Sequence, residues 1–329
     1  MVKFKKELAS LAFLAAKKNK KTAIFIGTTV KKTNFYSSKA RIGEHFCYIV
    51  AIVFSNKDCI NLCKIIDGKI DVVFYDLEKK NIIKSKKNTF NLERSVKESV
   101  LKSKIFPYKA NDITVQAAET LIHSFYKKDP KGIGGKKVLI IGCGNIGSKL
   151  ALKLTECGAK TFCHRRNKKS GKIIVNAINK MKPVNTIEKA TFVNNFYNFI
   201  ESSDIIINCS SKVNLIKKNF IKHFAKNQFI LDIGKGMFAK KALEDLIKIN
   251  NLVFRLDVTP GFNAFLTNYK STKNVFESSN FGRNTINKKT YISVGILGNK
   301  NEIVVDNPYR PKKVFGICDG KGNFIINEK

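Results

Sequence analysis

The chain has 329 residues, 43% of them hydrophobic, which is enough for a sizeable core and about two domains. Its 20 Gly and 6 Pro are too few for a collagen-like or Pro-rich chain. No stretch reaches the roughly 18 consecutive apolar residues of a membrane-spanning helix. The formal net charge is +36, but the lysines are spread along the whole chain. That distribution favours a solvated basic surface over a nucleic-acid site.

The cysteines show no metal-binding pattern. None forms a Cys-x-x-Cys pair, and the nearest spacing lacks a second Cys or His pair, so we expect no metal site. We interpret them as buried thiols of a reducing compartment, and we expect a cytoplasmic protein. The eight are Cys47, Cys59, Cys63, Cys143, Cys157, Cys163, Cys209 and Cys318.

The first sixteen residues are basic, then apolar, then small, which superficially matches a secretory signal peptide. The alternative is an amphipathic first helix, and we favour it because Glu7 lies in the basic segment and four lysines, Lys17, Lys18, Lys20 and Lys21, follow the apolar run at once. Its apolar face would carry Leu8, Leu11, Ala12 and Ala15.

Residues 1–110 mix short β-like segments with polar loops, and a helical pattern follows over Asn111–Tyr126, with Asp112 or Thr114 as its N-cap. From Lys136 the chain alternates between strands and helices, which predicts a parallel, doubly wound sheet. The first region's expected strands are Ala23–Ile26, Tyr48–Phe54 and Ile70–Tyr75. Those of the second are Val138–Ile141, Thr161–His164, Ile205–Asn208, Phe229–Asp232 and Val253–Asp257.

After Asp257 the alternation stops. Residues 259–286 are polar and aromatic, and short strand-like segments follow, the last two joined by a hairpin turn at Asp319–Gly322. We expect this tail to return to the N-terminal region. The fold class is therefore α/β, with a Rossmann sheet (residues 112–258) inserted between the two halves, 1–111 and 259–329, of a second α/β or α+β domain. The expected tail strands are Tyr291–Leu297, Glu302–Val305, Val314–Ile317 and Phe324–Ile326.

A Gly-x-Gly-x-x-Gly sequence follows the first strand of the alternating region and opens a helix. In that context Gly142 permits a tight turn, Gly144 lets a pyrophosphate approach the backbone, and Gly147 lets the helix pack closely. The pyrophosphate would lie on the free amides of the helix N-terminus, at Asn145 and Ile146. The motif predicts a dinucleotide site.

The end of the second strand bears on which dinucleotide binds. NAD-preferring enzymes carry an acidic residue there, whereas this chain has His164 followed by Arg165 and Arg166. Guanidinium groups pair bidentately with phosphate, so the sequence favours the 2′-phosphate of NADP over NAD. A solvated basic loop is the alternative.

The stretch VLIIGCGNIGSKLALKLTECGAKTFCHRRN resembles the cofactor domain of the shikimate dehydrogenase and glutamyl-tRNA reductase group of NADP-binding proteins, over roughly residues 110–260. The resemblance implies that Arg165 receives the 2′-phosphate and that Ser210, in SDIIINCSS, lies on the nicotinamide side. The substrate motifs are not matched. Of the Asn-Thr-Asp-Gly motif of the shikimate dehydrogenases, this chain has only Asn111-Asp112. Glutamyl-tRNA reductases use a nucleophilic Cys in the N-terminal region, but no motif of that family surrounds Cys47, Cys59 or Cys63.

Polar residues near the strand ends are the candidates for catalysis. A Lys–Asp pair can hold and transfer a proton while a hydride moves, if both groups reach one substrate oxygen. For each candidate a loop ion pair or a helix cap is an equally good interpretation. The four are Lys109, Asp112, Lys235 and Asp257.

These features predict an NADP-dependent oxidoreductase acting on a small, polar, anionic metabolite in a cleft between domains. The alternatives are a nucleotide-sensing or nucleic-acid-binding protein and an S-adenosylmethionine-dependent methyltransferase, the latter suggested by Ile230–Gly236. We expect no membrane partner and no nucleic acid. A monomer and a homodimer both remain open.

Overall fold

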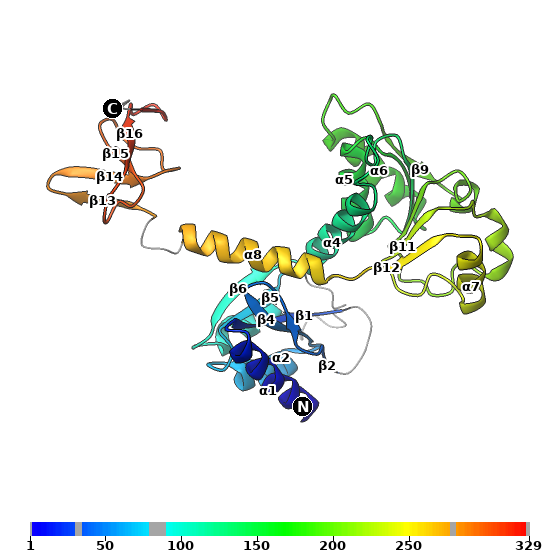
Figure 1. Cartoon of the computed structure of the whole chain (residues 1–329), viewed down its shortest axis with the longest axis horizontal. Coiled ribbons are helices and arrows are strands. Elements are labelled where there is room, and N and C mark those ends of the chain that lie inside the picture. Colours follow the sequence, from blue (N-terminus) through cyan, green and yellow to red (C-terminus); the bar gives the residue numbers. More distant parts are fainter. Residues whose placement is uncertain (1, 30–34, 79–89, 277–280, 327–329) are drawn as a thin grey trace. The chain divides into compact units, whose positions relative to one another are not determined.

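The computed structural model describes residues 2–29, 35–78, 90–276 and 281–326. The chain divides into two compact units. The first comprises Met1–Arg41 and Cys47–Phe262, and the second comprises Ile42–Phe46 and Asn263–Lys329. Figure 1 labels many of the elements of both.

A mixed sheet with strand order β2-β4-β1-β5-β6 organises the N-terminal region, and β3 pairs with β4. Neighbours β1 and β5, and β5 and β6, are parallel, whereas β2 and β4 are antiparallel. The strands are β1 (Lys21–Gly27), β2 (Tyr36–Ser37), β3 (Arg41–Ile42), β4 (Phe46–Ile52), β5 (Val72–Asp76) and β6 (Lys104–Tyr108). The helices are α1 (Val2–Lys17), α2 (Asn56–Ile66) and α3 (Leu92–Ser99).

Helix α1 confirms the amphipathic helix expected for the first residues. Phe4, Leu11 and Ala15 are buried in the core that α1 shares with β1, β4 and α2. Leu8 packs at the edge of this core, whereas Ala12 is exposed, so the expected face was wrong at that residue. The buried face includes Phe4 because the helix begins at Val2, about one turn before the apolar segment that starts at Leu8.

The second sheet is the doubly wound one. Its six strands are all parallel, in the order β12-β11-β10-β7-β8-β9. The first strand of this sheet in the sequence, β7, is therefore central, and the strand order reverses between β7 and β10. In such sheets ligands bind outside the carboxyl ends of the strands at the reversal. The strands are β7 (Lys137–Ile141), β8 (Lys160–His164), β9 (Ala190–Val193), β10 (Ile205–Asn208), β11 (Phe229–Asp232) and β12 (Leu252–Arg255).

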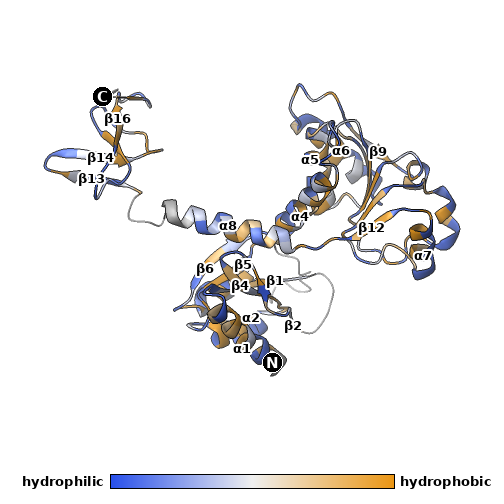
Figure 2. Ribbon diagram, in the orientation of Figure 1, coloured by the Kyte–Doolittle hydropathy of each residue, from blue (hydrophilic) through white to orange (hydrophobic). Residues whose placement is uncertain are grey.

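Helices cover both faces of this sheet, because successive strand residues point to opposite sides. Val138 and Ile140 lie in the core beneath α4, α5 and α6, and Leu139 and Ile141 lie in the core beneath α7 and two 3-10 turns. Figure 2 shows the strands as apolar and the outer helix faces as polar. The covering elements are α4 (Ala110–Phe125), α5 (Asn145–Glu156), α6 (Lys168–Met181), η1 (Phe196–Phe199), η2 (Lys218–His223) and α7 (Lys240–Lys248).

The helix expected over 111–126 is α4, but its N-cap is neither Asp112 nor Thr114. The cap residue is Lys109, whose side chain makes no capping bond. Carboxylates at the end of β5 and just after it accept hydrogen bonds from the free amides instead: Asp76 accepts from the Ala110 N–H at 3.2 Å and Glu78 from the Asn111 N–H at 2.6 Å. A cap supplied by a distant strand leaves no local sequence pattern.

The segment after β12, for which the sequence predicted no particular element, forms a helix, α8 (Thr259–Phe276). Its Phe262 ring packs against Phe25 and Tyr48 of the N-terminal sheet, with centroids 4.6 and 5.8 Å apart. Phe262, Leu266 and Tyr269 are buried at the spacing of one helix face, a helical pattern that was missed in the sequence.

The second unit contains a five-stranded sheet of its own, in the order β13-β14-β15-β16-β17. The turn at Asp319–Gly322 joins the antiparallel β16 and β17, which confirms the expected hairpin. Expected strand 291–297 ends earlier, because Gly295 turns the backbone at φ 92°. The expected return of this tail to the N-terminal region, and the three domain boundaries, stay predictions. The strands are β13 (Arg283–Ile286), β14 (Lys289–Ser293), β15 (Ile303–Val305), β16 (Val314–Cys318) and β17 (Phe324–Ile325).

None of the helices in the described residues combines the length and the apolar character needed to cross a bilayer.

Candidate functional site

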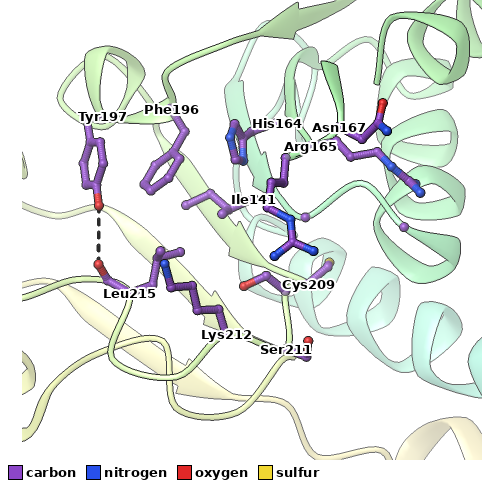
Figure 3. A pocket seen from close by; sticks show the side chains of 14 residues that line it. Ile141, His164, Arg165, Asn167, Phe196, Tyr197, Cys209, Ser211, Lys212 and Leu215 are labelled. Atoms are coloured by element: carbon purple, nitrogen blue, oxygen red, sulfur yellow. Dashed lines mark hydrogen bonds between the residues drawn. The ribbon is translucent and has the colours of Figure 1, made fainter. Parts of the chain in front are cut away.

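A cavity of about 670 Å³ opens where the order of the parallel sheet reverses. The ends of β7, β8 and β10 and the loops that follow them form its walls, and Figure 3 shows their side chains converging on it. Of the eight expected cofactor residues, five line this cavity. They are Gly142, Gly144, Arg165, Arg166 and Ser210.

Two glycines of the loop are required by the packing of the backbone. Gly142 has φ 96°, a conformation that favours glycine, and a Cβ there would lie 2.7 Å from the Ser210 nitrogen. A Cβ on Gly147 would lie 2.6 Å from the Gly142 carbonyl oxygen. Both contacts are far inside van der Waals distance, so the turn and the close approach of α5 require glycine at both positions.

Gly144 is different, because a Cβ there would meet nothing within 4 Å. Gly144 is also the N-cap of α5 and has no side chain to cap it. The empty space thus faces the uncapped first turn of the helix, which contains the exposed Asn145 and the half-buried Ile146. Free amides and the positive end of the helix dipole favour an anionic group at this point.

Arg165 is folded back onto the glycine loop. Its Nη1 donates a hydrogen bond to the Cys143 carbonyl oxygen at 2.7 Å, and the side chain is partly buried. In Figure 3 the guanidinium group lies between Ile141 and Cys209, at the wall of the cavity. A guanidinium group has five N–H donors, so this bond leaves others for an anion in the cavity.

Arg166 is exposed, and no hydrogen bond or ion pair holds it within the described parts of the chain. The next residue, Asn167, caps α6 by accepting from the Ser170 N–H at 2.9 Å. No carboxylate lines the cavity, as far as the described residues show. The rim is therefore cationic where an NAD-preferring enzyme would place an acidic residue.

His164 ends β8 and brings an imidazole to the cavity. Its Nδ1 is buried and has no hydrogen-bond partner among the described residues, and its ring meets Phe196 edge-on at 4.9 Å. Burial lowers the pKa of His164 below its usual value, so the ring is neutral at pH 7. A buried polar atom without a partner at a cavity wall indicates a position that a ligand or water completes.

A hydrogen-bond network joins the ends of β10 and β11. The Asn208 amide donates to Asp232 at 2.7 Å, and its oxygen accepts from the Ser210 N–H and hydroxyl at 3.0 and 2.9 Å. Asp232 also accepts from the Gly236 N–H at 2.7 Å and the Met237 N–H at 3.2 Å. The network fixes the loop between these residues.

Lys235 lies in that loop, with the left-handed φ of 63° that a non-glycine residue seldom adopts. Its exposed side chain lines a second cavity, of about 510 Å³. Among the described residues, Arg41 is the other cationic residue that lines the second cavity. The other walls are largely apolar or hydroxyl-bearing: Thr29, Phe35, Tyr36, Ser38, Val50, Ile52, Val258 and Phe262.

Asp257 lies beside the second cavity and braces it. Its carboxylate accepts from the Thr259 N–H at 3.0 Å and from the Thr259 hydroxyl at 2.7 Å, and that hydroxyl accepts from Arg41 Nη1 at 3.2 Å. The Thr259 hydrogen bonds and the Arg41 cation lower the pKa of Asp257. Asp257 is thus a carboxylate at neutral pH.

Lys109 and Asp112, the other two candidates, line neither cavity. Lys109 is exposed at the start of α4. Asp112 is half exposed and pairs with Lys149, which also approaches Glu78 at 3.6 Å. The structure thus gives Asp112 an ion pair between α4 and α5 and does not bring it to Lys235. The catalytic roles of all four candidates stay predictions.

The cysteines of the N-terminal region are poorly placed for nucleophilic chemistry. Cys47, Cys59 and Cys63 are fully buried. Burial raises the pKa of Cys47, and the neighbouring Cys63 thiol together with burial raises that of Cys59. All eight cysteines are free thiols, and the described residues hold no cluster of metal-ligating side chains.

Arg41 and Asn208 were missed from the sequence. A signal for Arg41 was available: only seven of the 61 basic residues are Arg, and three of the seven line the two cavities. An Arg in such a Lys-rich chain marks a position where a planar, bidentate cation is needed. Asn208 had no such signal, because its partner Asp232 is contributed by the next strand of the sheet.

Comparison with known proteins identifies the type of the central domain. Residues 109–263 match the model of the D-isomer specific 2-hydroxyacid dehydrogenase, NAD binding domain. No curated protein matches the chain. The expected likeness to the NADP-binding Rossmann domains was therefore correct for the fold, whereas the family model that matches is a different one.

Several solved structures are similar at low identity. A dipicolinate synthase from Bacillus halodurans is 14% identical, with a TM-score of 0.37 over 77% of this chain and 97% of that one. L-tryptophan dehydrogenase from Nostoc punctiforme is 12% identical, with a TM-score of 0.45 over 78% of this chain and 79% of that one. A glutamate dehydrogenase is 14% identical, with a TM-score of 0.43 over 71% and 60% of the two chains.

The central domain is thus an NAD(P)-binding Rossmann domain of the 2-hydroxyacid dehydrogenase type. Its glycine loop, uncapped helix and parallel strand order are the features that such a domain needs.

Proposed function

We propose that the protein is an NADP-dependent oxidoreductase acting on a small anionic metabolite. One observation carries the proposal: the cavity at the glycine loop has a cationic rim, with Arg165 and Arg166 following β8 where an NAD enzyme places a carboxylate. The space beside Gly144 and the buried, unpartnered Nδ1 of His164 fit a bound dinucleotide.

The two arginines serve different parts of the cofactor in this proposal. Arg165 holds the Cys143 carbonyl and so fixes the loop that receives the pyrophosphate, which NAD and NADP share. Arg166 is exposed and free to pair with the 2′-phosphate, which only NADP has. Cofactor preference therefore depends on Arg166, and cofactor affinity in general depends on Arg165.

When bound, a nicotinamide cofactor donates or accepts a hydride. This chain's own residues orient the substrate and manage the proton. Ser210, held by Asn208, lies at the end of β10 where the nicotinamide side is expected. The Lys235 ammonium, presented by the loop that Asp232 fixes, donates a hydrogen bond to the substrate oxygen at which the proton is exchanged. Asp257 is already an ionised brace for Thr259, so we assign it no proton transfer.

The methyltransferase alternative is less well supported. The sequence that suggested it, Ile230–Gly236, comprises most of β11 and the loop after it, whereas the glycine loop follows the central strand β7. The Asp232 carboxylate is also occupied by Asn208 and two backbone amides. These three hydrogen bonds commit the Asp232 carboxylate to fixing the loop after β11 and leave it less able to bind a ribose.

Ligand-dependent thermal unfolding tests the proposal. A ligand that binds only the native state raises the free energy of unfolding by RT ln(1 + [L]/Kd), about 2.7 kcal/mol at a hundredfold excess over Kd. We expect NADPH to raise the Tm most, NADH less, and S-adenosylmethionine not at all. A shift with S-adenosylmethionine and none with NADPH would overturn the proposal.

A further inference from the structure

The loop between α6 and β9 (residues 182–189) carries the two most exposed of the large apolar side chains in the described residues (Figure 1). Val184 is 98% exposed and Ile187 is 91% exposed, and Met181, the last residue of α6, is 60% exposed. A single exposed apolar residue is ordinary on a protein surface. Three within one short stretch of chain indicate a surface that interacts with something.

This loop is held in shape with its apolar side chains exposed. At its base, the Asn179 side chain donates to the Ala190 carbonyl oxygen at 2.8 Å and accepts from the Ala190 N–H at 2.9 Å. Within it, the Thr186 N–H donates to the Pro183 carbonyl oxygen at 3.0 Å, which closes a four-residue turn with Val184 at a central position. The apolar side chains are therefore presented by a fixed turn.

The charges around the loop are almost all positive. From Cys157 to Ile187 the sequence contains eight Lys and Arg residues and no Asp or Glu, whereas the whole chain has 61 basic and 25 acidic residues. Helix α6 and the loop together hold six lysines, five of them exposed, and one acidic residue, Glu188. A complementary partner is therefore anionic, and it also offers an apolar layer. The six are Lys168, Lys169, Lys172, Lys180, Lys182 and Lys189.

Among anionic partners, the surface of a lipid bilayer fits both features. Its headgroups attract clustered lysines, and apolar side chains bury themselves at the boundary between headgroups and acyl chains. A single-stranded nucleic acid also attracts lysines, but its bases stack on aromatic side chains, and residues 181–189 include none.

We propose that the α6–β9 loop and the exposed side of α6 form a docking surface for an anionic membrane. Met181, Val184 and Ile187 enter the boundary between headgroups and acyl chains, and the lysines pair with the anionic headgroups. The expectation of no membrane partner rested on the lack of a spanning segment, and binding to the surface of a bilayer needs none.

The chain contains no tryptophan, so an introduced one reports on the loop alone. The full chain carrying Val184→Trp is mixed with vesicles of phosphatidylcholine and phosphatidylserine. We expect its emission to shift to shorter wavelength and to be quenched by lipids with brominated acyl chains, and we expect neither change with phosphatidylcholine alone. Ile247→Trp, at an exposed apolar residue of α7, is the matched control and should not respond.

Sedimentation with the same vesicles measures how the chain with its native loop partitions. Val184→Ser combined with Ile187→Ser removes the apolar side chains without changing the charge. Partition should fall at least about tenfold, the factor that burial of one such side chain supplies. Lys172→Gln combined with Lys180→Gln keeps the apolar side chains and should also cost at least about tenfold, since one lysine near an anionic surface contributes about fivefold.

Two double variants elsewhere in the chain match these changes. Ile247→Ser with Leu101→Ser removes two other exposed apolar side chains, and Lys240→Gln with Lys241→Gln removes two exposed lysines of α7. Both should partition within about twofold of the wild type. All four double variants should keep the wild-type Tm, because every replaced side chain is exposed.

Several results would overturn the proposal. Equal losses in the α7 lysine variant would show that the general charge of +36 binds the vesicles. Equal partition onto phosphatidylcholine alone, or no partition of the wild type onto anionic vesicles, would exclude an anionic membrane as the partner. Unchanged partition of the double serine variant, with duplex DNA competing for the chain, would indicate a site for nucleic acid. These measurements need no cofactor, so the proposed function is tested separately.

Discussion

The division of labour between Arg165 and Arg166 leads to the most specific prediction. Arg166→Gln removes an exposed cation with no partner in the described residues, so the fold should lose nothing. The 2′-phosphate loses a hydrogen bond to a charged group, worth about 1.5–3 kcal/mol. Since about 1.4 kcal/mol is a factor of ten, the Kd for NADPH should rise at least about tenfold, and the Kd for NADH should stay within about twofold.

Arg165→Gln should behave differently. It removes the 2.7 Å bond that holds the Cys143 carbonyl, and with it the orientation of the glycine loop. Both dinucleotides use that loop for the pyrophosphate, so the affinities for NADPH and NADH should fall by similar factors. The ratio of the two Kd values is thus expected to change in the Arg166 variant and to stay nearly constant in the Arg165 variant.

Fluorescence titration of reduced cofactor, in the wild type and the single variants, measures both Kd values directly. Lys168→Gln is the matched control, because it removes an exposed cation from the same segment without touching the cavity. Equal losses for NADPH and NADH in Arg166→Gln would show that Arg166 only contributes to the general basic field. A comparable loss of NADPH affinity in the Lys168 variant would show the same. In that case added salt would weaken the binding of NADPH and of NADH together.

Three further predictions concern the site and its support. Gly144→Ala should keep the wild-type Tm, because its Cβ would meet nothing within 4 Å, but should lose affinity for both cofactors. Gly142→Ala, whose Cβ would lie 2.7 Å from a backbone nitrogen, should lower the Tm as well. Equal losses of Tm in the two variants would contradict the role assigned to the loop. Asp232→Ala leaves three hydrogen-bond donors without their acceptor and should cost about 2–4 kcal/mol in chemical denaturation; a loss under about 1 kcal/mol would show that water replaces the carboxylate. Burial lowers the pKa of His164 in the folded state, so as the pH falls the unfolded state binds a proton at this residue before the folded state does. The contribution of the neutral imidazole to the free energy of unfolding is therefore present above pH 6.5 and is lost as the pH falls through the folded-state pKa. His164→Gln should flatten the dependence of the free energy of unfolding on pH in this range, and an unchanged dependence would exclude the imidazole as its source.

The central domain could be predicted in detail because its determinants are local. Five of the six strands of its sheet contain a short apolar run, and the glycine pattern specifies the turn between β7 and α5. The strand missed, β9, has only two buried residues, Ala190 and Val193, at the edge of the sheet. Its sequence, Ala-Thr-Phe-Val, includes a small and a polar residue and is not a distinct apolar run.

The second cavity could not be predicted for the opposite reason. Arg41 and Thr259 are 218 positions apart in the chain, and only the packing of Phe262 on the N-terminal sheet brings them together. Helix α8 was missed although its buried residues Phe262, Leu266 and Tyr269 are spaced by four and three positions, as on one face of a helix. Lys235 and Asp257 were identified as candidates from the sequence. That Lys235 lines a cavity and that Asp257 is hydrogen-bonded to Thr259 depends on the tertiary structure.

The most direct test of the account is the preference between the two dinucleotides. Isothermal titration of the full chain with NADPH and with NADH, at one salt concentration, gives both Kd values. The account predicts saturable binding of NADPH with one site per chain and at least about tenfold weaker binding of NADH. Equal affinities would contradict the assignment of the cationic rim to a 2′-phosphate, and no binding of either dinucleotide would contradict the account as a whole.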